Sequence, residues 1–221
     1  MDAKKAAAEK AVAEVKDGMT LGLGTGSTAY WAIQQIGERV REGLKVSAVA
    51  TSQRSEQQAR DLNIPIISFA EINEIDLTID GADEIDKYRN LVKGGGGALL
   101  REKIIAYNSK RFIVVVDDSK MVEHLGKFPL PVEIVPFAFE LTIRKLNALG
   151  CRPLIRKKDG KDFITDNGNL IADCHFYLID DPETLNHQLH LIPGVVETGL
   201  FLNSKVASIY IGDSSGEVRI M

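Results

Sequence analysis

The chain has 221 residues, of which 44% are hydrophobic, and its 27 basic and 31 acidic residues leave a formal net charge of -4. This length allows one large domain or a main domain with a smaller partner, and the lack of a basic excess argues against nucleic acid as a general partner. No apolar run approaches the roughly 18 residues that a membrane-spanning helix requires, and the N-terminus leads into charged, alanine-rich sequence instead of a signal peptide, so we expect a cytoplasmic protein without membrane contact.

The first half of the chain alternates strand patterns with helix patterns. Helices are predicted over residues 4–16, 29–40, 52–62 and 98–107, and strands over 19–23, 46–50, 65–69, 77–80 and 112–116. Alternation of this kind predicts an α/β fold with a doubly wound, mostly parallel, Rossmann-like sheet. Polar residues follow several of the strands, at the edge where open α/β sheets bind ligands.

The pattern changes near residues 127–131, where two prolines interrupt the chain. Beyond this point we predict a strand over 132–135, a helix over 137–149, short strands around 166–169 and a helix over 182–191. Two later strands, over 207–211 and 217–220, are suited to rejoin the first sheet. We therefore predict an α/β catalytic domain over 1–126, completed by 199–221, and a smaller α+β subdomain over 127–198 that carries the lid or oligomer contacts.

A glycine loop, Gly22-Leu23-Gly24-Thr25-Gly26-Ser27-Thr28, separates the first strand from the second helix. Its backbone N–H groups, hydroxyls and following helix N-terminus suit a phosphate. It lacks the Lys of a Walker A loop, and Ser27 stands where a dinucleotide fingerprint has its third glycine, so NAD is disfavoured. A plain turn in which Ser27 caps the helix is an equally good interpretation of the loop alone.

An acidic segment, Asp80-Gly81-Ala82-Asp83-Glu84, follows the strand at 77–80. Crowded carboxylates raise the pKa of at least one of them, which suits proton transfer near neutral pH. A turn with a helix cap and a metal site are the alternatives. The segment contains no histidine and lacks calcium-loop spacing, which disfavours a metal.

A second glycine loop, Lys93-Gly94-Gly95-Gly96-Gly97, places a cation beside backbone that can approach a ligand closely. Glu102 follows in the first turns of the next predicted helix. Taken alone, Glu102 is best interpreted as an exposed helical charge.

Together these segments resemble ribose-5-phosphate isomerase, type A. The resemblance is carried by residues 24–28, 80–84, 93–96 with 98–99 and 101–103, 126–133, 165–169 and 192–196, and it covers nearly the whole chain. The joint order and spacing of these motifs are highly specific, although each motif alone is weak. Gly97 stands where Ala is also found in the family.

The resemblance implies an isomerase of the non-oxidative pentose phosphate pathway that interconverts D-ribose 5-phosphate and D-ribulose 5-phosphate through an enediolate. It implies no metal and no cofactor, and a homodimer or homotetramer. The catalytic residues it implies are Glu102 as the carbon base, Asp80 and Asp83 for hydroxyl protons and ring opening, and Lys93 for developing negative charge. The substrate-binding residues it implies are Thr25, Gly26, Ser27, Thr28, Gly81, Ala82, Gly94, Gly95, Gly96 and Lys120, with Lys4 or Lys5 as a further candidate for the phosphate.

Two other functions fit parts of the sequence. A sugar-phosphate-binding regulatory module normally carries a helix-turn-helix, for which the segment before the strand at 19–23 is too short, and the chain has no basic patch. An acyl-CoA transferase or another sugar-phosphate enzyme matches the architecture, but the paired Asp80 and Asp83 with Glu102 suit sugar isomerisation better. We therefore expect the isomerase.

Overall fold

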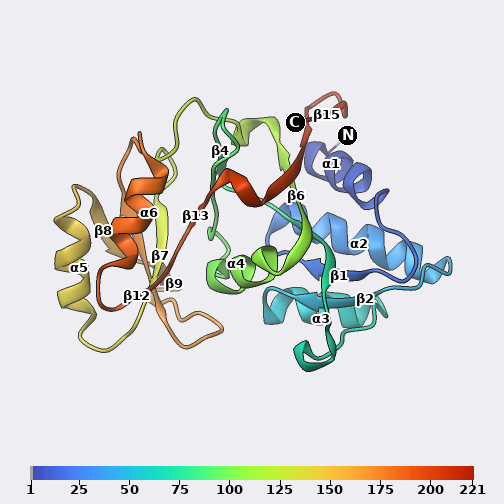
Figure 1. The fold of residues 1–221 in the computed structure, drawn as a ribbon, viewed down its shortest axis with the longest axis horizontal. Coiled ribbons are helices and arrows are strands. Elements are labelled where there is room, and N and C mark those ends of the chain that lie inside the picture. The colour runs from blue at the N-terminus through green and yellow to red at the C-terminus, as the bar shows by residue number, and fades with distance from the viewer. Residues whose placement is uncertain (1) are drawn as a thin grey trace. The chain divides into compact units, whose positions relative to one another are not determined.

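The computed structural model describes residues 2–221, which form two compact units (Figure 1). Unit 1 contains the chain up to Ala82 together with Arg101–Lys120 and Ser204–Met221, and unit 2 contains Asp83–Leu100 and Met121–Asn203. The predicted division placed residues 83–100 in the first domain, whereas here they cluster with the second. The reason is that two short strands in this segment pair with each other, and one of them also pairs with a strand near residue 200, in a sheet of unit 2.

Unit 1 is built on a six-stranded sheet in the order β15-β14-β6-β3-β1-β2. Its strands are β1 (Thr20–Leu23), β2 (Ser47–Ala50), β3 (Ile75–Asp80), β6 (Ser109–Asp117), β14 (Val206–Gly212) and β15 (Val218–Ile220). All neighbours are parallel except β14 and β15. This arrangement confirms the predicted doubly wound, mostly parallel α/β fold, and the last two strands do join the first sheet.

Helices cover both faces of this sheet. They are α1 (Ala3–Val12), α2 (Ser27–Arg41), α3 (Gln53–Asp61) and α4 (Leu99–Tyr107), with short 3-10 turns at Phe69–Glu71, Asp118–Lys120 and Asn203–Lys205. Apolar residues of α1, α2 and α3 form the larger core with one face, while Ile105 of α4 packs with Val49 and Ile75 on the other. No helix within residues 2–221 has the length and apolar character needed to cross a membrane.

The α1 helix is fastened to the sheet by a polar contact just beyond its C-terminus. Glu14 accepts hydrogen bonds from the Tyr210 hydroxyl and from the Arg111 guanidinium, the latter at 2.6 Å. The Tyr210 hydrogen bond lowers the pKa of Glu14, and burial raises the pKa of Tyr210 to about 12. At the other end of α1, Gly212 has no side chain and lets the backbone of α1 approach the end of β14. Both contacts fix the register of α1 on the sheet.

The strand register brings the carboxyl ends of the parallel strands to one edge. Leu23, the last residue of β1, is level with Ala50 on one side and Ile79 on the other, and Asp80 is level with Val114 of β6. The loops that follow β1, β2, β3 and β6 therefore leave the sheet at the same edge. This is the ligand edge expected for an open α/β sheet.

Unit 2 combines three antiparallel sheets with two helices. A four-stranded sheet runs β12-β7-β11-β8, a three-stranded sheet runs β13-β5-β4, and a hairpin joins β9 to β10. The elements are β4 (Glu84–Ile85), β5 (Leu91–Val92), β7 (Leu130–Ile134), α5 (Phe139–Asn147), β8 (Arg152–Ile155), β9 (Lys157–Lys158), β10 (Lys161–Asp162), β11 (Leu170–His175), α6 (Pro182–His190), β12 (Val195–Thr198) and β13 (Leu200–Phe201).

The predicted strand over 65–69 is wrong. Only Ile66 makes a bridge, to Ala48, and Ser68 then starts a 3-10 turn through a capping box with Glu71. Pro65 has no N–H to give to a strand partner, and a serine three residues before a glutamate is a strong turn signal. The short strands β4, β5 and β13 were not predicted, because two residues carry no readable alternation.

Candidate functional site

The first glycine loop joins β1 to α2 in unit 1. Gly26 is the N-cap of α2, with a φ of 118°, and no side chain caps this helix. The helix-cap interpretation of Ser27 therefore does not hold, because Ser27 is the first helical residue and its hydroxyl accepts from Lys4 Nζ at 3.1 Å. Gly26 and Ser27 are exposed, while Thr28 is buried. The helix N-terminus thus offers backbone N–H groups and a lysine to an incoming anion.

The hydroxyl of Thr25 faces the start of α3. It lies 2.7 Å from the Thr51 hydroxyl, 2.7 Å from the Ser52 hydroxyl and 3.2 Å from the Ser55 hydroxyl. Ser55 in turn donates to the carbonyl of Gly24 at 2.7 Å. The side chain of Thr25 therefore links the loop to the start of α3, while its backbone N–H contacts Asp80 at the end of β3. Thr51, Ser52 and Ser55 were not predicted as site residues, and Thr51 and Ser52 directly follow β2.

Asp80, at the end of β3, is only 1% exposed and is held by backbone amides. Its Oδ1 accepts from the N–H of Thr25 at 3.0 Å and from the N–H of Gly81 at 2.7 Å. This contact requires a glycine at position 24, because a Cβ there would lie 2.2 Å from Asp80 Oδ1. The structure thus brings together the first glycine loop and the first carboxylate of the acidic segment.

Two cations of unit 1 lie near the carboxyl ends of the strands. Lys4 Nζ is 3.8 Å from Asp117 Oδ2, at the end of β6, in addition to its contact with Ser27. Lys5 instead pairs with Glu9 and lies over the ring of Trp31. Lys120 ends the 3-10 turn that follows β6 and is half-buried. Of the two N-terminal lysines, Lys4 is therefore the one that contacts the glycine loop.

Glu102 lies in the first turn of α4 and is 2% exposed. The interpretation as an exposed helical charge is therefore wrong for this residue. Taking a carboxylate out of water is costly, so a buried glutamate at a helix start points to a specific requirement for that group.

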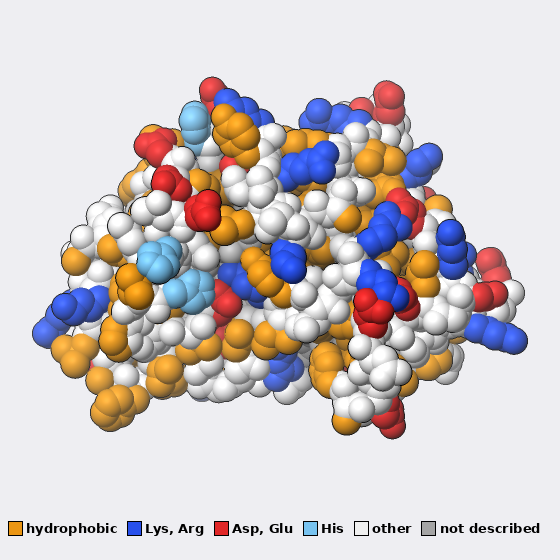
Figure 2. All heavy atoms as spheres, in the orientation of Figure 1, with side chains coloured by type: hydrophobic (Ala, Val, Ile, Leu, Met, Phe, Trp, Pro, Cys, Tyr) orange, Lys and Arg blue, Asp and Glu red, His pale blue; other side chains and the backbone are white. Residues whose placement is uncertain are grey.

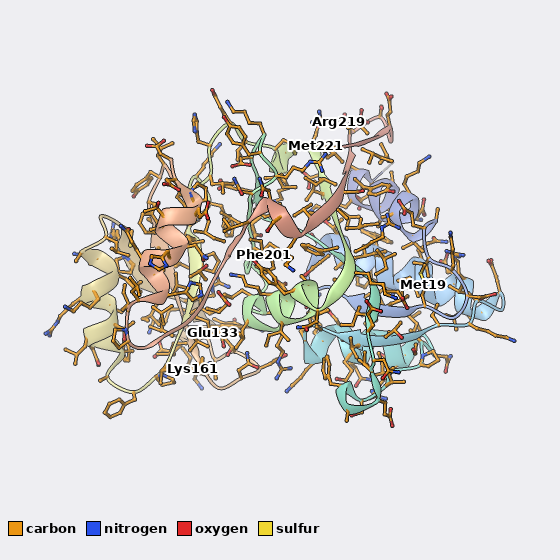
Figure 3. All side chains as sticks on the ribbon, in the orientation of Figure 1. Met19, Glu133, Lys161, Phe201, Arg219 and Met221 are labelled. Carbon is orange, nitrogen blue, oxygen red and sulfur yellow. The ribbon has the colours of Figure 1, made fainter. Side chains whose placement is uncertain are left out.

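In unit 2, Asp83 is bound by the second glycine loop. Its Oδ2 accepts from the N–H of Gly95 at 2.7 Å, and its own N–H donates to the carbonyl of Val92 at 2.8 Å. Lys93, directly after β5, is 2% exposed, and its ammonium lies 5.4 Å from the centre of the Phe201 ring (Figure 3). The structure therefore places Asp83, Lys93 and the glycines 94–96 in one local arrangement.

Glu84, the last carboxylate of the acidic segment, has a structural role. It is 3% exposed, and its two oxygens accept from the N–H groups of Gly126 and Phe128 at 2.7 and 2.6 Å. Both oxygens are thus engaged by the backbone that leads into β7. In the acidic segment, Asp80 and Asp83 each contact a glycine loop, whereas Glu84 binds the backbone before β7.

The polar side chains of the motif at residues 165–169 bind the buried carboxylate of Glu133. Glu133 of β7 is fully buried, and its Oε1 accepts from the Thr165 hydroxyl and from the amides of Asn167 and Asn169 (Figure 3). A buried carboxylate requires such donors. This motif stabilises the turn before β11.

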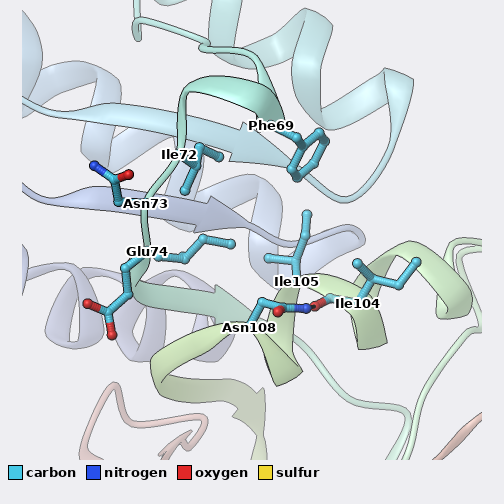
Figure 4. Close-up of a pocket in the computed structure, with 8 residues that line it drawn as sticks. Phe69, Ile72, Asn73, Glu74, Ile104, Ile105 and Asn108 are labelled. Atoms are coloured by element: carbon cyan, nitrogen blue, oxygen red, sulfur yellow. Dashed lines mark hydrogen bonds between the residues drawn. The ribbon is translucent and has the colours of Figure 1, made fainter.

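A cavity of about 250 Å³ lies in unit 1 beside Ile75, where β3 begins (Figure 4). Its lining includes Phe69, Ile104 and Asn108, and none of the predicted site residues belongs to it. Since β3 ends at Asp80, the cavity is at the edge opposite the ligand edge. Among residues 2–221, no three His, Cys, Asp or Glu side chains are grouped to hold a metal ion.

Comparisons with known proteins agree with this geometry. Residues 47–216 match the family model of ribose 5-phosphate isomerase A (phosphoriboisomerase A). The chain is 54% identical to the ribose-5-phosphate isomerase A of Bacillus mycoides (strain KBAB4), over 98% of both chains. A solved ribose 5-phosphate isomerase A from Methanocaldococcus jannaschii has a TM-score of 0.94 at 44% identity, covering 100% of this chain and 98% of that one. A D-ribose-5-phosphate isomerase solved in complex with phospho-erythronic acid has a TM-score of 0.94 at 39% identity, covering 100% and 97%.

Proposed function

The chain belongs to the ribose 5-phosphate isomerase A family, and we propose from this that it interconverts D-ribose 5-phosphate and D-ribulose 5-phosphate. The reaction moves one proton between C2 and C1 of the open-chain sugar. A base removes the C2 proton, and the bonding electrons form a C1–C2 double bond while O1 gains a proton. The same proton or its equivalent is then delivered to C1 as the O2 proton leaves and C2 becomes the carbonyl. No electron leaves the sugar, so the chemistry requires no redox cofactor.

Unit 1 supplies the phosphate contacts and the carbon base in this proposal. The N–H groups of Gly26, Ser27 and Thr28 bind the phosphate with Lys4 and Lys120, because a helix N-terminus and ammonium groups both favour a dianion. Thr25 belongs to the same loop, and its N–H holds Asp80. Glu102 moves the carbon-bound proton, and Asp80 handles a hydroxyl proton during ring opening. Gly81 and Ala82 continue the same turn and contact the sugar.

Unit 2 supplies charge stabilisation. Asp83 is the second carboxylate for hydroxyl protons, and Lys93 offsets the negative charge that develops on the enediolate oxygens. The N–H groups of Gly94 and Gly96 add donors to that charge, while the N–H of Gly95 holds Asp83. A buried ammonium acts strongly on a nearby oxyanion because little water screens it.

The observation that carries the proposal is that two carboxylates three residues apart in the sequence are each held by a backbone N–H of a glycine loop. Asp80 is held by Thr25, and Asp83 is held by Gly95. A helix cap would need only one of these contacts. Such fixed carboxylates are suited to proton transfer, since their orientation costs nothing at the moment of reaction.

The test is turnover by the EDTA-treated protein, followed as ketose absorbance after addition of ribose 5-phosphate. We expect the wild-type protein to produce ribulose 5-phosphate, and Glu102→Gln to lower kcat by roughly 100- to 10,000-fold while sugar-phosphate binding persists. Glu38→Gln, the same change on an exposed residue of α2, is the control. Unchanged kcat in Glu102→Gln would contradict the assignment of the base, and activity lost with EDTA and restored by a divalent cation would favour a metal-dependent sugar-phosphate enzyme.

We also propose that the chain acts in the cytoplasm as a homodimer or homotetramer with contacts on unit 2. Large apolar side chains are exposed around α5 and beyond α6, and Figure 2 shows such side chains over α5. The most exposed are Phe137 at 87%, Leu191 at 67% and Leu141 at 59%. Light scattering on the wild-type protein and on Phe137→Asp tests the proposal, with a smaller particle expected for the variant.

A further inference from the structure

The carbonyl groups of the second glycine loop are held by an arginine that the sequence did not indicate. Arg156 follows β8, and its Nη1 donates to the carbonyl of Gly94 at 2.8 Å and to the carbonyl of Gly95 at 3.1 Å. Gly94 also accepts from the N–H of Gly97 at 3.0 Å, which closes the turn. All of these residues belong to unit 2.

The guanidinium is itself fixed from two further sides. Its Nε donates to Asp173 Oδ2 at 3.0 Å and its Nη2 donates to Asp173 Oδ1, so that Asp173 of β11 binds it in a fork. The ring of Phe163 lies 6.0 Å from its central carbon, and the same ring occupies the space where a side chain at Gly97 would stand. The side chains of Arg156 and Asp173 are 14% and 22% exposed. Only a planar group with several donors can make these contacts together.

The consequence follows from the planarity of the peptide bond. In a trans peptide the C=O and the N–H point in opposite directions, so a carbonyl held by Arg156 turns the N–H of the next residue away from it. The peptide that joins Gly94 to Gly95 has its carbonyl on Arg156 and its N–H on Asp83 Oδ2, at 2.7 Å. The peptide that joins Gly95 to Gly96 has its carbonyl on Arg156 too, so the N–H of Gly96 also points away from the guanidinium.

We propose that Arg156, oriented by Asp173, is a positioning residue that aims the N–H groups of Gly95 and Gly96 and thereby holds the Asp83 carboxylate. This inference rests on the proposed function, in which Asp83 and the glycine N–H groups act on the sugar. Arg156 itself does not touch the reacting atoms. Its effect is on the transition state, because misaligned donors lose charge stabilisation without losing the phosphate contacts of the first loop.

The experiment compares Arg156→Ala, Arg156→Lys and Asp173→Asn with Lys157→Met. Lys157 is the next residue and pairs with Asp162 at the surface, so Lys157→Met removes a neighbouring ion pair of the same hairpin. We expect Arg156→Ala to lower kcat by roughly 10- to 100-fold with KM for ribose 5-phosphate within about twofold, since a displacement of about 1 Å has an effect of this size. Arg156→Lys and Asp173→Asn should lower kcat by a smaller factor than Arg156→Ala does. Lys157→Met should have the kcat and KM of the wild type. Added guanidinium should restore part of the kcat of Arg156→Ala.

Each result decides the inference. A kcat within twofold of wild type in a folded Arg156 variant, a kcat loss matched by Lys157→Met, or a loss that guanidinium does not restore would overturn it. If Arg156→Ala does not fold, the same criteria apply to kcat and KM of Arg156→Lys and Asp173→Asn. A wild-type protein that produces no ketose would instead overturn the proposed function, so the two failures are distinguishable.

Discussion

The two glycine loops have similar sequences and similar contacts, but different supports. Each follows a short strand, precedes a helix and donates one backbone N–H to a carboxylate of the acidic segment. Behind the first loop stand the hydroxyls of Thr51, Ser52 and Ser55, which are neutral. Behind the second stands the guanidinium of Arg156, which is paired with Asp173.

This difference matches the charge that each loop is proposed to meet. Hydroxyls can both donate and accept, so they fix the first loop without adding charge, and the helix N-terminus and Lys4 remain the positive groups that a phosphate meets. The second loop has consecutive glycines and little intrinsic stiffness, so it needs a strong donor on its carbonyls. The Asp173 carboxylate neutralises the charge of that donor, the Arg156 guanidinium. Lys93 is therefore the cation proposed to act on the sugar.

The largest expected effect is at the first loop, where Gly24→Ala would place a Cβ 2.2 Å from Asp80 Oδ1 and 2.6 Å from Asp80 Cα. The contact with backbone cannot be relieved by a rotamer change, so we expect a loss of about 3 kcal/mol in the free energy of unfolding. Urea unfolding followed by circular dichroism measures it. Gly81→Ala is the stability control, because its Cβ would meet nothing closer than 3.7 Å. Equal stability of the two variants would contradict the close approach of β1 and β3.

The next effect is at the second loop, where Gly97 has a φ of 84° and a Cβ would lie 2.4 Å from the Phe163 ring. We therefore expect Gly97→Ala to lower the free energy of unfolding by about 1 to 2 kcal/mol. Gly160→Ala separates the causes, since Gly160 has a φ of 77° and open space around its Cβ position. If Gly97→Ala and Gly160→Ala lower the free energy of unfolding equally, the Phe163 ring does not clash with a side chain at position 97.

A smaller effect is expected from Lys4→Gln, which tests whether the first loop meets a phosphate. Losing one charge-assisted hydrogen bond should raise KM for ribose 5-phosphate about tenfold and leave kcat nearly unchanged. Lys5→Gln is the matched control, because Lys5 pairs with Glu9 and lies over Trp31. Steady-state kinetics at fixed ionic strength measures both. An equal change in the two variants would indicate a general effect of charge instead of a contact.

Sequence patterns predicted the parts of the molecule that depend on local periodicity. The parallel sheet of unit 1 followed from the alternation of strand and helix patterns, and the polar residues after the strands indicated the edge where the first glycine loop and Asp80 lie. The hydrogen bond between Asp83 and Gly95 was not predicted, because these residues flank the paired two-residue strands β4 and β5, which carry no readable pattern.

The supports of the loops could not be predicted in the same way. Arg156 and Asp173 meet the second loop only because β8 pairs with β11, and an isolated arginine in a basic stretch has no pattern that reveals a buried fork. The structural role of Glu84 was also hidden, because the sequence does not show that the N–H groups of Gly126 and Phe128 bind it. The burial of Glu102 was equally unreadable, since an exposed helical position and a buried one have the same local sequence.

The smallest expected effect concerns Ser55, which supports the first loop by donating to the carbonyl of Gly24. Ser55→Ala removes this donor at a site that is 4% exposed, so the free energy of unfolding should fall by about 1 kcal/mol. Because the loop then loses the donor to its Gly24 carbonyl, the KM for ribose 5-phosphate should rise by about two- to threefold, while kcat changes less. Ser68→Ala is the control, since the Ser68 hydroxyl likewise makes a hydrogen bond to backbone, in the 3-10 turn at Phe69–Glu71 instead of the loop. A similar loss of stability with no change in KM for both variants would mean that the hydroxyls behind the loop serve only the fold, and the contrast between the two loops would then rest on Arg156 alone.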